Sequence, residues 1–366
     1  MPVRAGFPRR KGERKMKKMK WTRVIAVFAL ILFSGVFFVL ETHAESKLPK
    51  IITMTSYPES TAVYAWTTGF RQAIEKFSPM KMRLEPYGTD LARFMLLMKK
   101  ESELVCASGG AVHIFSRALW DWEKYGPQAM QTVWSGPAIT PALLTRKDSG
   151  INTVADLKGK KLPFLSGGLA LMKSVEAALA FGSLTWDDVQ KVKVSSMRAL
   201  LGGIVNGAVD VTWSVPFTPA AQTLASSRHG AKWIELPKAD REGWKRLNAV
   251  APWVRPVTIS VGPGLSKEKP AQVGGYPNSI YAYDFLSEDI VYAVVKAMHK
   301  GYGAMKDMHP DLKRWSIKQA LNIGGMSEIP VHKGAITYFK EIGQWTPVHE
   351  KWQARQLADQ KKRLGR

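Results

Sequence analysis

The sequence predicts an α/β protein made of two similar units and a helical tail. Short apolar runs alternate with longer amphipathic segments, glycine, serine and proline separate the two kinds, and the pattern after residue 285 is helical. The chain has 366 residues, of which 45% are hydrophobic. Two domains with a core in each are therefore expected, and disorder is not.

The first unit has a strand-helix-strand-helix-strand order, which predicts parallel strands joined by crossover helices. The apolar runs place the strands at 51–56, 81–87 and 103–108. The amphipathic segments place helices at 61–77 and 90–100, and a further helical run leads toward Trp122.

The second unit opens with an extended stretch at 132–147, where Pro137 and Pro141 exclude a helix. Further strands are expected at 154–165, 191–196, 209–214 and 231–237. A helix is expected at 198–207, before the strand at 209–214. Residues 251–278 are rich in glycine and proline and are expected to form loops. The last strand is expected at 278–285, and the helices of the tail follow it.

The N-terminus has the composition of an export signal. A basic run at 1–23 precedes the apolar run Val24–Leu40, and small residues follow at 42–44. This order is typical of a secretory signal peptide. The apolar run of 17 residues also reaches the lower limit for spanning a bilayer, so an uncleaved membrane anchor is the alternative. Residues 1–44 are therefore assigned to a signal peptide or anchor, and the rest of the chain is expected in the periplasm.

The remaining charge favours anionic partners over nucleic acid. The formal net charge is +23, of which residues 1–44 carry +8, leaving +15 on the rest. Such a balance favours an anionic ligand or an anionic membrane surface, although a merely solvated basic surface is the alternative. The basic residues are dispersed, which argues against nucleic-acid binding. Cys106 is the single cysteine, so an intrachain disulfide is excluded.

The turns after the predicted strands contain the candidate binding residues. In open α/β sheets ligands bind beyond the carboxyl ends of the strands, where helix N-termini offer free N–H groups. The recurring hydroxyl, glycine and aromatic residues at these turns form the predicted ligand-binding set, which comprises Ser56, Tyr57, Ser60, Tyr87, Thr89, Asp90, Ser108, Gly109, Ser166, Gly167, Gly168, Arg198 and Trp213. Any one of them could be only a helix cap, but their recurrence indicates a shared cleft.

Two of these turns suggest how an anion would be held. The turn Ser166-Gly167-Gly168 has neither P-loop nor GxGxxG spacing, so a nucleotide is not indicated. Two glycines and a hydroxyl suit a carboxylate or another small polar group. Arg198 is expected to pair with such a carboxylate through two hydrogen bonds.

Catalytic patterns are missing from the sequence. HExxH, GxSxG and other standard metal or nucleophile spacings do not occur among the seven histidines, the serines and Cys106. Thr185 to Asp188 is interpreted as a helix start rather than an acid/base pair. We therefore expect no enzyme, no metal and no cofactor, with an exported enzyme on the same fold as the alternative.

Several segments resemble the TAXI-type solute receptors of TRAP transporters, a group of bacterial extracytoplasmic binding proteins. The similar segments are IITMTSYPESTAVYAWTTGF (51–70), VADLKGKKLPFLSGGLALMKSVEAAL (154–179), NGAVDVTW (206–213), DIVYAVVKAMHKGYGAMKDMHPDLKRW (289–315) and EIPVHKGAITYFKEIGQW (328–345). The last segment is the most specific, with matches at Pro330, His332, Gly334, Ala335 and Tyr338.

The resemblance implies a two-lobed periplasmic-binding-protein fold of type II, with the ligand between the lobes. One lobe would comprise residues 45–145 and 275–366, and the other 146–274. The implied ligand is a small organic acid such as glutamate or a dicarboxylate, and the implied partner is a TRAP-type membrane permease driven by a sodium gradient. A monomer is expected, with His332 and Lys333 used for packing or for the permease surface.

The chain departs from the family at two turns. Relatives often have a Gly-Ser-Gly-Thr turn where this chain has Ser166-Gly167-Gly168-Leu169, and an asparagine of the second turn is replaced within GTDLARF. Glutamate is therefore not assumed. A receptor of an ATP-driven importer and a sensory receptor without a permease remain the alternative functions.

Overall fold

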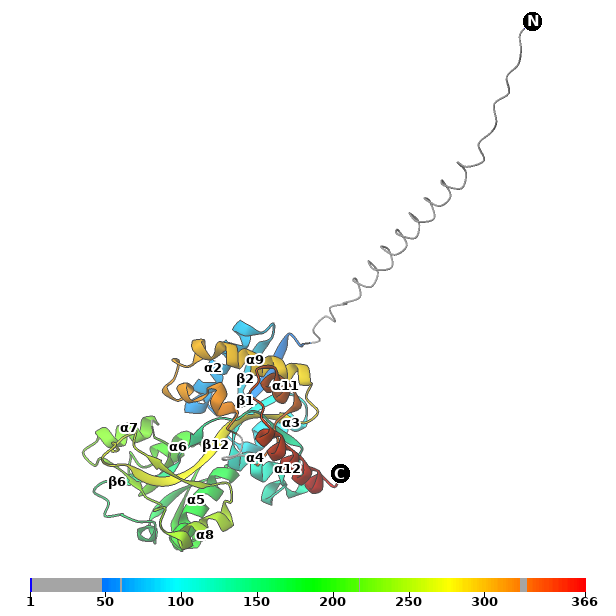
Figure 1. Ribbon diagram of the computed structural model, residues 1–366. Coiled ribbons are helices and arrows are strands. Elements are labelled where there is room, and N and C mark those ends of the chain that lie inside the picture. Colours follow the sequence, from blue (N-terminus) through cyan, green and yellow to red (C-terminus); the bar gives the residue numbers. More distant parts are fainter. Residues whose placement is uncertain (2–47, 60, 217, 323–327) are drawn as a thin grey trace. The chain divides into compact units, whose positions relative to one another are not determined.

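The computed structural model describes residues 1, 48–59, 61–216, 218–322 and 328–366. The chain divides into two units, Met1–Lys47 and Leu48–Arg366, and the second unit holds the sheets and helices labelled in Figure 1. The predicted signal peptide or anchor lies outside the described residues, apart from Met1. Within the described ranges, no helix combines the length and the apolar character needed to cross a bilayer.

The largest sheet contains the three strands of the first predicted unit. Its members are β1 (Ile51–Ser56), β2 (Lys81–Pro86), β3 (Leu104–Ser108), β4 (Met130–Trp134), β5 (Ala138–Ile139), β11 (Arg255–Ile259) and β12 (Ala271–Tyr283). The main order is β2-β1-β3-β12-β4, with β11 and β5 also paired to β12. Strands β1, β2 and β3 are parallel, as predicted, and β12 runs antiparallel to β3 and β4.

Strand β3 is buried on both faces because helices cover both sides of this sheet. Leu104 and Cys106 belong to one hydrophobic cluster, while Val105 and Ala107 belong to another. The helices of this part are α2 (Ala62–Phe77), α3 (Asp90–Met98), α4 (Gly109–Ser116), α9 (Glu288–Met305), α10 (Ile317–Ala320), α11 (Lys333–Glu341) and α12 (Pro347–Leu364). A continuous apolar run such as β3 is what a strand between two helical layers requires.

Helices α2 and α9 approach each other closely through a glycine. A Cβ atom built on Gly301 would lie 2.5 Å from Cβ of Ala73, a distance that no side chain tolerates. Phe70 and Ile74 of α2 and Val294 and Met298 of α9 are all fully buried in the same cluster. The tail is therefore helical, as predicted, and its helix α9 packs on α2.

The second predicted unit forms two smaller sheets. The three-stranded sheet has the antiparallel order β10-β6-β9, and a parallel pair joins β7 to β8. These strands are β6 (Ala142–Arg146), β7 (Lys161–Leu165), β8 (Gln190–Val194), β9 (Val211–Ser214) and β10 (Ala231–Ile234). The helices of this part are α5 (Leu169–Phe181), α6 (Met197–Gly202), α7 (Pro219–Ser226) and α8 (Arg241–Val250).

The expectation of loops at 251–278 is wrong for much of that range. Strand β11 and the first half of β12 occupy it and pair with each other in antiparallel register. The proline of β11, Pro256, is tolerated because this strand pairs only with β12 and forms an edge. Gly274 and Gly275 leave space for β11, because a Cβ on either would lie 2.8 Å or less from Val254 or Val257.

Strand β12 connects the two parts of the fold. At its start, the carbonyl of Gln272 accepts a hydrogen bond at 2.7 Å from the backbone N–H of Leu236, which follows β10. The second half of β12 pairs with β3 and β4. The predicted α/β class is confirmed, with one part built on the large sheet and the other on the two smaller sheets. The lobe limits at residues 145/146 and 274/275 stay predictions.

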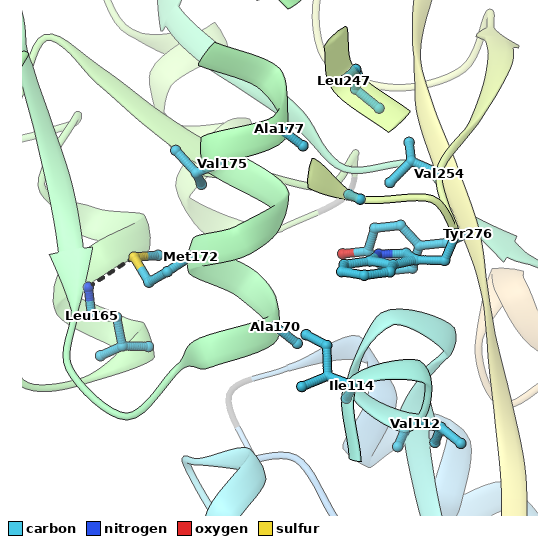
Figure 2. Packing of buried hydrophobic residues seen from close by; sticks show 14 of the residues in the cluster. Val112, Ile114, Leu165, Ala170, Met172, Val175, Ala177, Leu247, Val254 and Tyr276 are labelled. Carbon is cyan, nitrogen blue, oxygen red and sulfur yellow. Dashed lines mark hydrogen bonds between the residues drawn. The ribbon is translucent and has the colours of Figure 1, made fainter. Parts of the chain in front are cut away.

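Helix α5 has an apolar face that meets α8 and β12 (Figure 2). Ala177 of α5 belongs to the same buried cluster as Leu247 of α8 and Tyr276 of β12, whereas Met172 lies on the side of α5 that faces Leu165 (Figure 2). The backbone N–H of Leu165, at the end of β7, donates to Sδ of Met172 at 3.3 Å. The turn between β7 and α5 is therefore fixed on its inner side by a buried contact.

Candidate functional site

A cleft of about 840 Å³ lies beyond the carboxyl ends of the strands. Its lining residues lie at or just after the carboxyl ends of β1, β2, β3, β7 and β9, and further parts come from α2, β11, β12 and residues 309–314. Open α/β sheets bind ligands at this position. The volume falls within the range of small-molecule sites, roughly 300–1,000 Å³.

Most of the cleft wall is apolar. The larger apolar and aromatic side chains in it include Val63, Trp66, Ile139, Leu171, Met197, Leu201, Trp213, Val257 and Tyr276. The ring N–H of Trp66 donates to Nδ1 of His309 at 3.2 Å, which fixes the orientation of that indole. The cleft therefore suits a solute with an apolar body and a small number of polar atoms.

The polar centre of the cleft is built around Arg93 of α3. Its side chain is 1% exposed, and one terminal nitrogen lies 2.5 Å from Oδ1 of Asp90. The other terminal nitrogen donates to the carbonyl of Tyr87 at 2.8 Å. The guanidinium carbon lies 3.7 Å from the centre of the Tyr57 ring, a stacked cation–π geometry.

Tyr57 joins this group to strand β3. Its hydroxyl oxygen accepts a hydrogen bond from the backbone N–H of Ser108 at 3.2 Å. Burial raises the pKa of the Tyr57 hydroxyl above its ordinary value, despite the opposing effect of Arg93. The hydroxyl is therefore protonated at neutral pH and can donate to a bound solute.

The Ser166-Gly167-Gly168 turn faces a carboxylate of the protein itself. Oδ2 of Asp90 accepts a hydrogen bond from the backbone N–H of Ala170, at the start of α5, at 3.2 Å. Gly167 has φ +78, and a Cβ on it would lie 3.1 Å from Cγ2 of Thr89. Glycine at 167 thus lets the turn approach residues 89 and 90.

Three residues that line the cleft each have a buried side-chain N–H group without a hydrogen-bond partner among the described residues. These groups are Nε of Arg93, Nδ2 of Asn278 and Nε1 of Trp213. Asn278 is 1% exposed and lies opposite Ser108 in the ladder between β12 and β3. Since a buried donor without a partner is unfavourable by about 1–3 kcal/mol, each favours a solute that brings an oxygen acceptor.

Five residues of the predicted set line this cleft, namely Tyr57, Asp90, Ser108, Gly168 and Trp213. Other members have local roles: Ser56 is buried against Oγ1 of Thr67, Thr89 caps α3, and Gly109 is the first residue of α4. The Tyr87 hydroxyl faces Glu85.

The remaining members lie apart from the cleft or are not described. Ser166 and Arg198 are exposed and are not part of the cleft wall, and Gly167 lines a separate hollow of about 610 Å³ beside Asp90 and Trp120. Ser60 lies outside the described residues. The expected pairing of a solute carboxylate with Arg198 has no counterpart in this cleft, where Arg93 is the buried cation.

Arg93 and Asn278 are absent from the predicted set. Arg93 follows Asp90 by three residues, and this i,i+3 spacing at the start of a helix after the second strand is a visible pattern. Asn278 follows Pro277 inside a strand, and no local pattern in the sequence indicates that β12 passes the cleft.

The described residues contain no group of three or more His, Cys, Asp and Glu side chains placed to hold a metal ion. Cys106 is fully buried, and this burial raises the pKa of its thiol to about 12. The thiol is therefore protonated at neutral pH and is a poor nucleophile. The arrangement at the cleft is suited to hydrogen bonding and apolar contact.

Solved structures with a similar course of the chain include three binding proteins. The alkanesulfonate-binding protein SsuA from Xanthomonas axonopodis pv. citri, bound to MOPS, is 15% identical, with a TM-score of 0.47. The match covers 82% of this chain and 85% of the SsuA chain. PhnD1 from Prochlorococcus marinus (MIT 9301), in complex with methylphosphonate, is 10% identical, with a TM-score of 0.48. The match covers 81% of this chain and 100% of the PhnD1 chain. AbpA from Streptococcus pneumoniae Canada MDR_19A, bound to L-arginine, is 11% identical, with a TM-score of 0.42. The match covers 74% of this chain and 94% of the AbpA chain. Among curated proteins no match is found.

A family model, described as the NMT1-like family, matches residues 96–343. The matched span contains Ser108, Gly168, Trp213 and Asn278 of the cleft. Its description does not name the TAXI-type receptors, so that finer resemblance stays a prediction. Because the match extends over more than half of the sequence, the chain belongs to the NMT1-like family.

Proposed function

We propose that this protein is an extracytoplasmic solute-binding protein that captures a small organic acid in the cleft and releases it unchanged. The observation that carries the proposal is that three residues lining one cleft, Arg93, Asn278 and Trp213, each have a buried N–H group without a hydrogen-bond partner among the described residues. A solute with oxygen acceptors satisfies these donors, and this gain is available only when the solute is bound.

The position of the cleft supports reversible capture. Its walls come from both parts of the fold, with Tyr57 and Ser108 on one side and Leu171 and Trp213 on the other. Closure of two such parts around a solute is a common hinge motion, and it removes water from the polar contacts. Export of the chain is supported by the order of basic, apolar and small residues at 1–44.

The partner in the membrane would be an importer. We place an ATP-driven importer first, because the chain belongs to the NMT1-like family and the matching model does not reproduce the TAXI resemblance. A sodium-driven TRAP permease is the second candidate, and the segment EIPVHKGAITYFKEIGQW at 328–345 is the observation that favours it. In both cases the receptor would act as a monomer that delivers one solute molecule.

Native mass spectrometry and thermal unfolding test the proposal. The full chain without residues 1–44, purified from its host under mild conditions, is expected to carry a small molecule that denaturation releases. The released molecule should raise the melting temperature of the emptied protein when it is added back, since a ligand of the folded state stabilises it by mass action. A protein that carries no small molecule, and whose melting temperature no organic acid or amino acid shifts, would contradict the proposal.

A further inference from the structure

The charges that line the cleft are already paired. Arg93 lies 2.5 Å from Asp90, and Arg314 lies 3.8 Å from Asp311. These two are the Arg and Lys residues of the described lining, and Glu59, the remaining carboxylate of the lining, is exposed. A solute therefore meets one buried cation, Arg93, whose charge is partly balanced by Asp90.

The helix end that would receive a second anion is also occupied. The first turn of α5 presents N–H groups and the positive end of the helix dipole, but Oδ2 of Asp90 accepts from Ala170 there. A second solute carboxylate at this point would lie next to the Asp90 carboxylate. Like charges in a site of reduced dielectric repel strongly.

The part of the cleft wall that comes from α5, α6 and the residues after β9 offers apolar surface and few donors. Leu171 of α5, Met197 and Leu201 of α6, and Val215 and Pro216 after β9 contribute apolar atoms to it. The polar groups on this wall, the indole N–H of Trp213 and the hydroxyl of Thr218, are neutral. A charged group on this side would lose its water without gaining a counter-ion.

We infer that the solute is a monoacid, with one head group of oxygen acceptors at Arg93 and Asn278 and an apolar body against Trp213 and Leu171. The inference rests on the proposed function and deepens it, because it replaces the expected dicarboxylate or glutamate. Asp90 is the residue that sets this selectivity, because it occupies the helix end and balances Arg93.

Isothermal calorimetry with matched acids tests the inference. The probes are hexanoate against adipate, and 3-phenylpropanoate against its 4-carboxyphenyl analogue, with glutamate as a further dicarboxylate. Each monoacid is expected to bind at least about tenfold more tightly than its diacid, a difference of about 1.4 kcal/mol. Equal or tighter binding of adipate or glutamate would overturn the inference and leave the proposed function in place.

A charge-removing variant tests the role of Asp90. In Asp90→Asn the like charge is gone while an amide oxygen remains for Ala170, so the preference for hexanoate over adipate is expected to fall by about tenfold. The matched control is Asp121→Asn, because Asp121 is exposed and lies outside the cleft wall. An unchanged preference in a folded Asp90→Asn protein would show that Asp90 does not set the selectivity.

The wild-type panel remains decisive if Asp90→Asn does not fold. If no probe acid binds and native mass spectrometry finds a different class of solute, the inference fails and the proposed function stands. If no probe binds and no solute is found, both fail.

Discussion

The carboxylate of Asp90 accepts a hydrogen bond from the backbone N–H of Ala170, which follows it by 80 residues, at 3.2 Å. The same carboxylate lies 2.5 Å from Arg93. One buried side chain thus joins the start of α3 to the start of α5. Asp90 also lines both the cleft and the separate hollow beside Trp120, so it forms part of the wall between them.

Removal of the Asp90 carboxylate is expected to destabilise the protein. Asp90→Ala leaves Arg93, which is 1% exposed, as an uncompensated buried charge, and breaking a buried pair in this way costs about 3–5 kcal/mol. Because water can enter the cleft, the free energy of unfolding is expected to fall by about 3 kcal/mol, the lower end of this range. Urea unfolding followed by circular dichroism measures it. Asp121→Ala is the control, expected within about 0.5 kcal/mol of wild type, and a loss below 1 kcal/mol in Asp90→Ala would contradict the expectation.

Gly150 and Gly167 both have a positive φ angle, so alanine at each position measures the cost of backbone strain with and without a steric contact. Gly167 has φ +78 and Gly150 has φ +74, but only a Cβ on Gly167 meets a neighbour, Cγ2 of Thr89 at 3.1 Å. Gly150→Ala is expected to cost about 1 kcal/mol from strain alone. Gly167→Ala should cost more because Thr89 must also move.

The free energies of unfolding of four variants, measured by thermal unfolding, give the cost of the steric contact. The variants are Gly150→Ala, Gly167→Ala, Thr89→Ser and the double variant Thr89→Ser/Gly167→Ala. Thr89→Ser removes the methyl group but keeps the hydroxyl that caps α3. In the Thr89→Ser background, Gly167→Ala is expected to cost about as much as Gly150→Ala. If the two glycine variants are equally stable in the wild-type background, the steric contact does not contribute.

The fold class follows from local patterns, and the failures follow from contacts distant in the sequence. The runs at 51–56 and 103–108 predict β1 and β3, because strands buried on both faces are continuously apolar. The run at 81–87 predicts β2 through its alternation of polar and apolar residues, which is typical of a strand that is only partly buried. Strand β11 and the start of β12 have the glycine and proline content of a loop. They form strands because the glycines of β12 let β11 approach, which depends on pairing rather than on composition.

Part of the lining of the candidate cleft was predictable, namely the part that depends on topology. Five residues of the predicted set line the cleft: Ser108 and Trp213 lie at the carboxyl ends of β3 and β9, and Tyr57, Asp90 and Gly168 lie in the turns or helix starts after β1, β2 and β7. The partner of the Ser166-Gly167-Gly168 turn could not be predicted in this way. An anion at a helix N-terminus is a reasonable expectation, but local sequence does not indicate that Asp90 supplies it.

Loss of one donor in the cleft is expected to move affinity and stability in opposite directions. Asn278→Leu removes an amide whose Nδ2 has no partner among the described residues, so the empty protein should be as stable as wild type or slightly more stable. The affinity for a bound acid should fall by about tenfold, the value of one hydrogen bond to a charged group. Calorimetry and thermal unfolding of the same sample measure both.

Asn206→Leu provides the control for this variant. Asn206 is exposed and lies outside the cleft wall, so solute affinity should not change. A loss of stability in Asn278→Leu without a loss of affinity would indicate that Asn278 is a packing residue and would remove it from the binding site.

The buried side chain of His332, which caps the N-terminus of α11, is expected to make the free energy of unfolding depend on pH. Burial lowers the pKa of His332 from about 6.5 to about 4, and its Nδ1 accepts a hydrogen bond from the backbone N–H of Gly334 at 3.2 Å. Between these two pKa values the unfolded chain binds a proton that the folded protein does not. Stability from this group is therefore present above pH 6.5 and is lost as the pH falls toward 4.

Asn at position 332 keeps a side-chain oxygen for the N–H of Gly334 but does not titrate. The free energy of unfolding of wild type is expected to fall by about 2–3 kcal/mol more than that of His332→Asn between pH 7 and pH 4. Urea unfolding at a series of pH values gives this difference, in which the titration of carboxylates common to both proteins cancels. If the free energy of unfolding depends on pH in the same way in wild type and in His332→Asn, the pKa of His332 is the same in the folded and unfolded states. That result would contradict the expectation that His332 is neutral when buried.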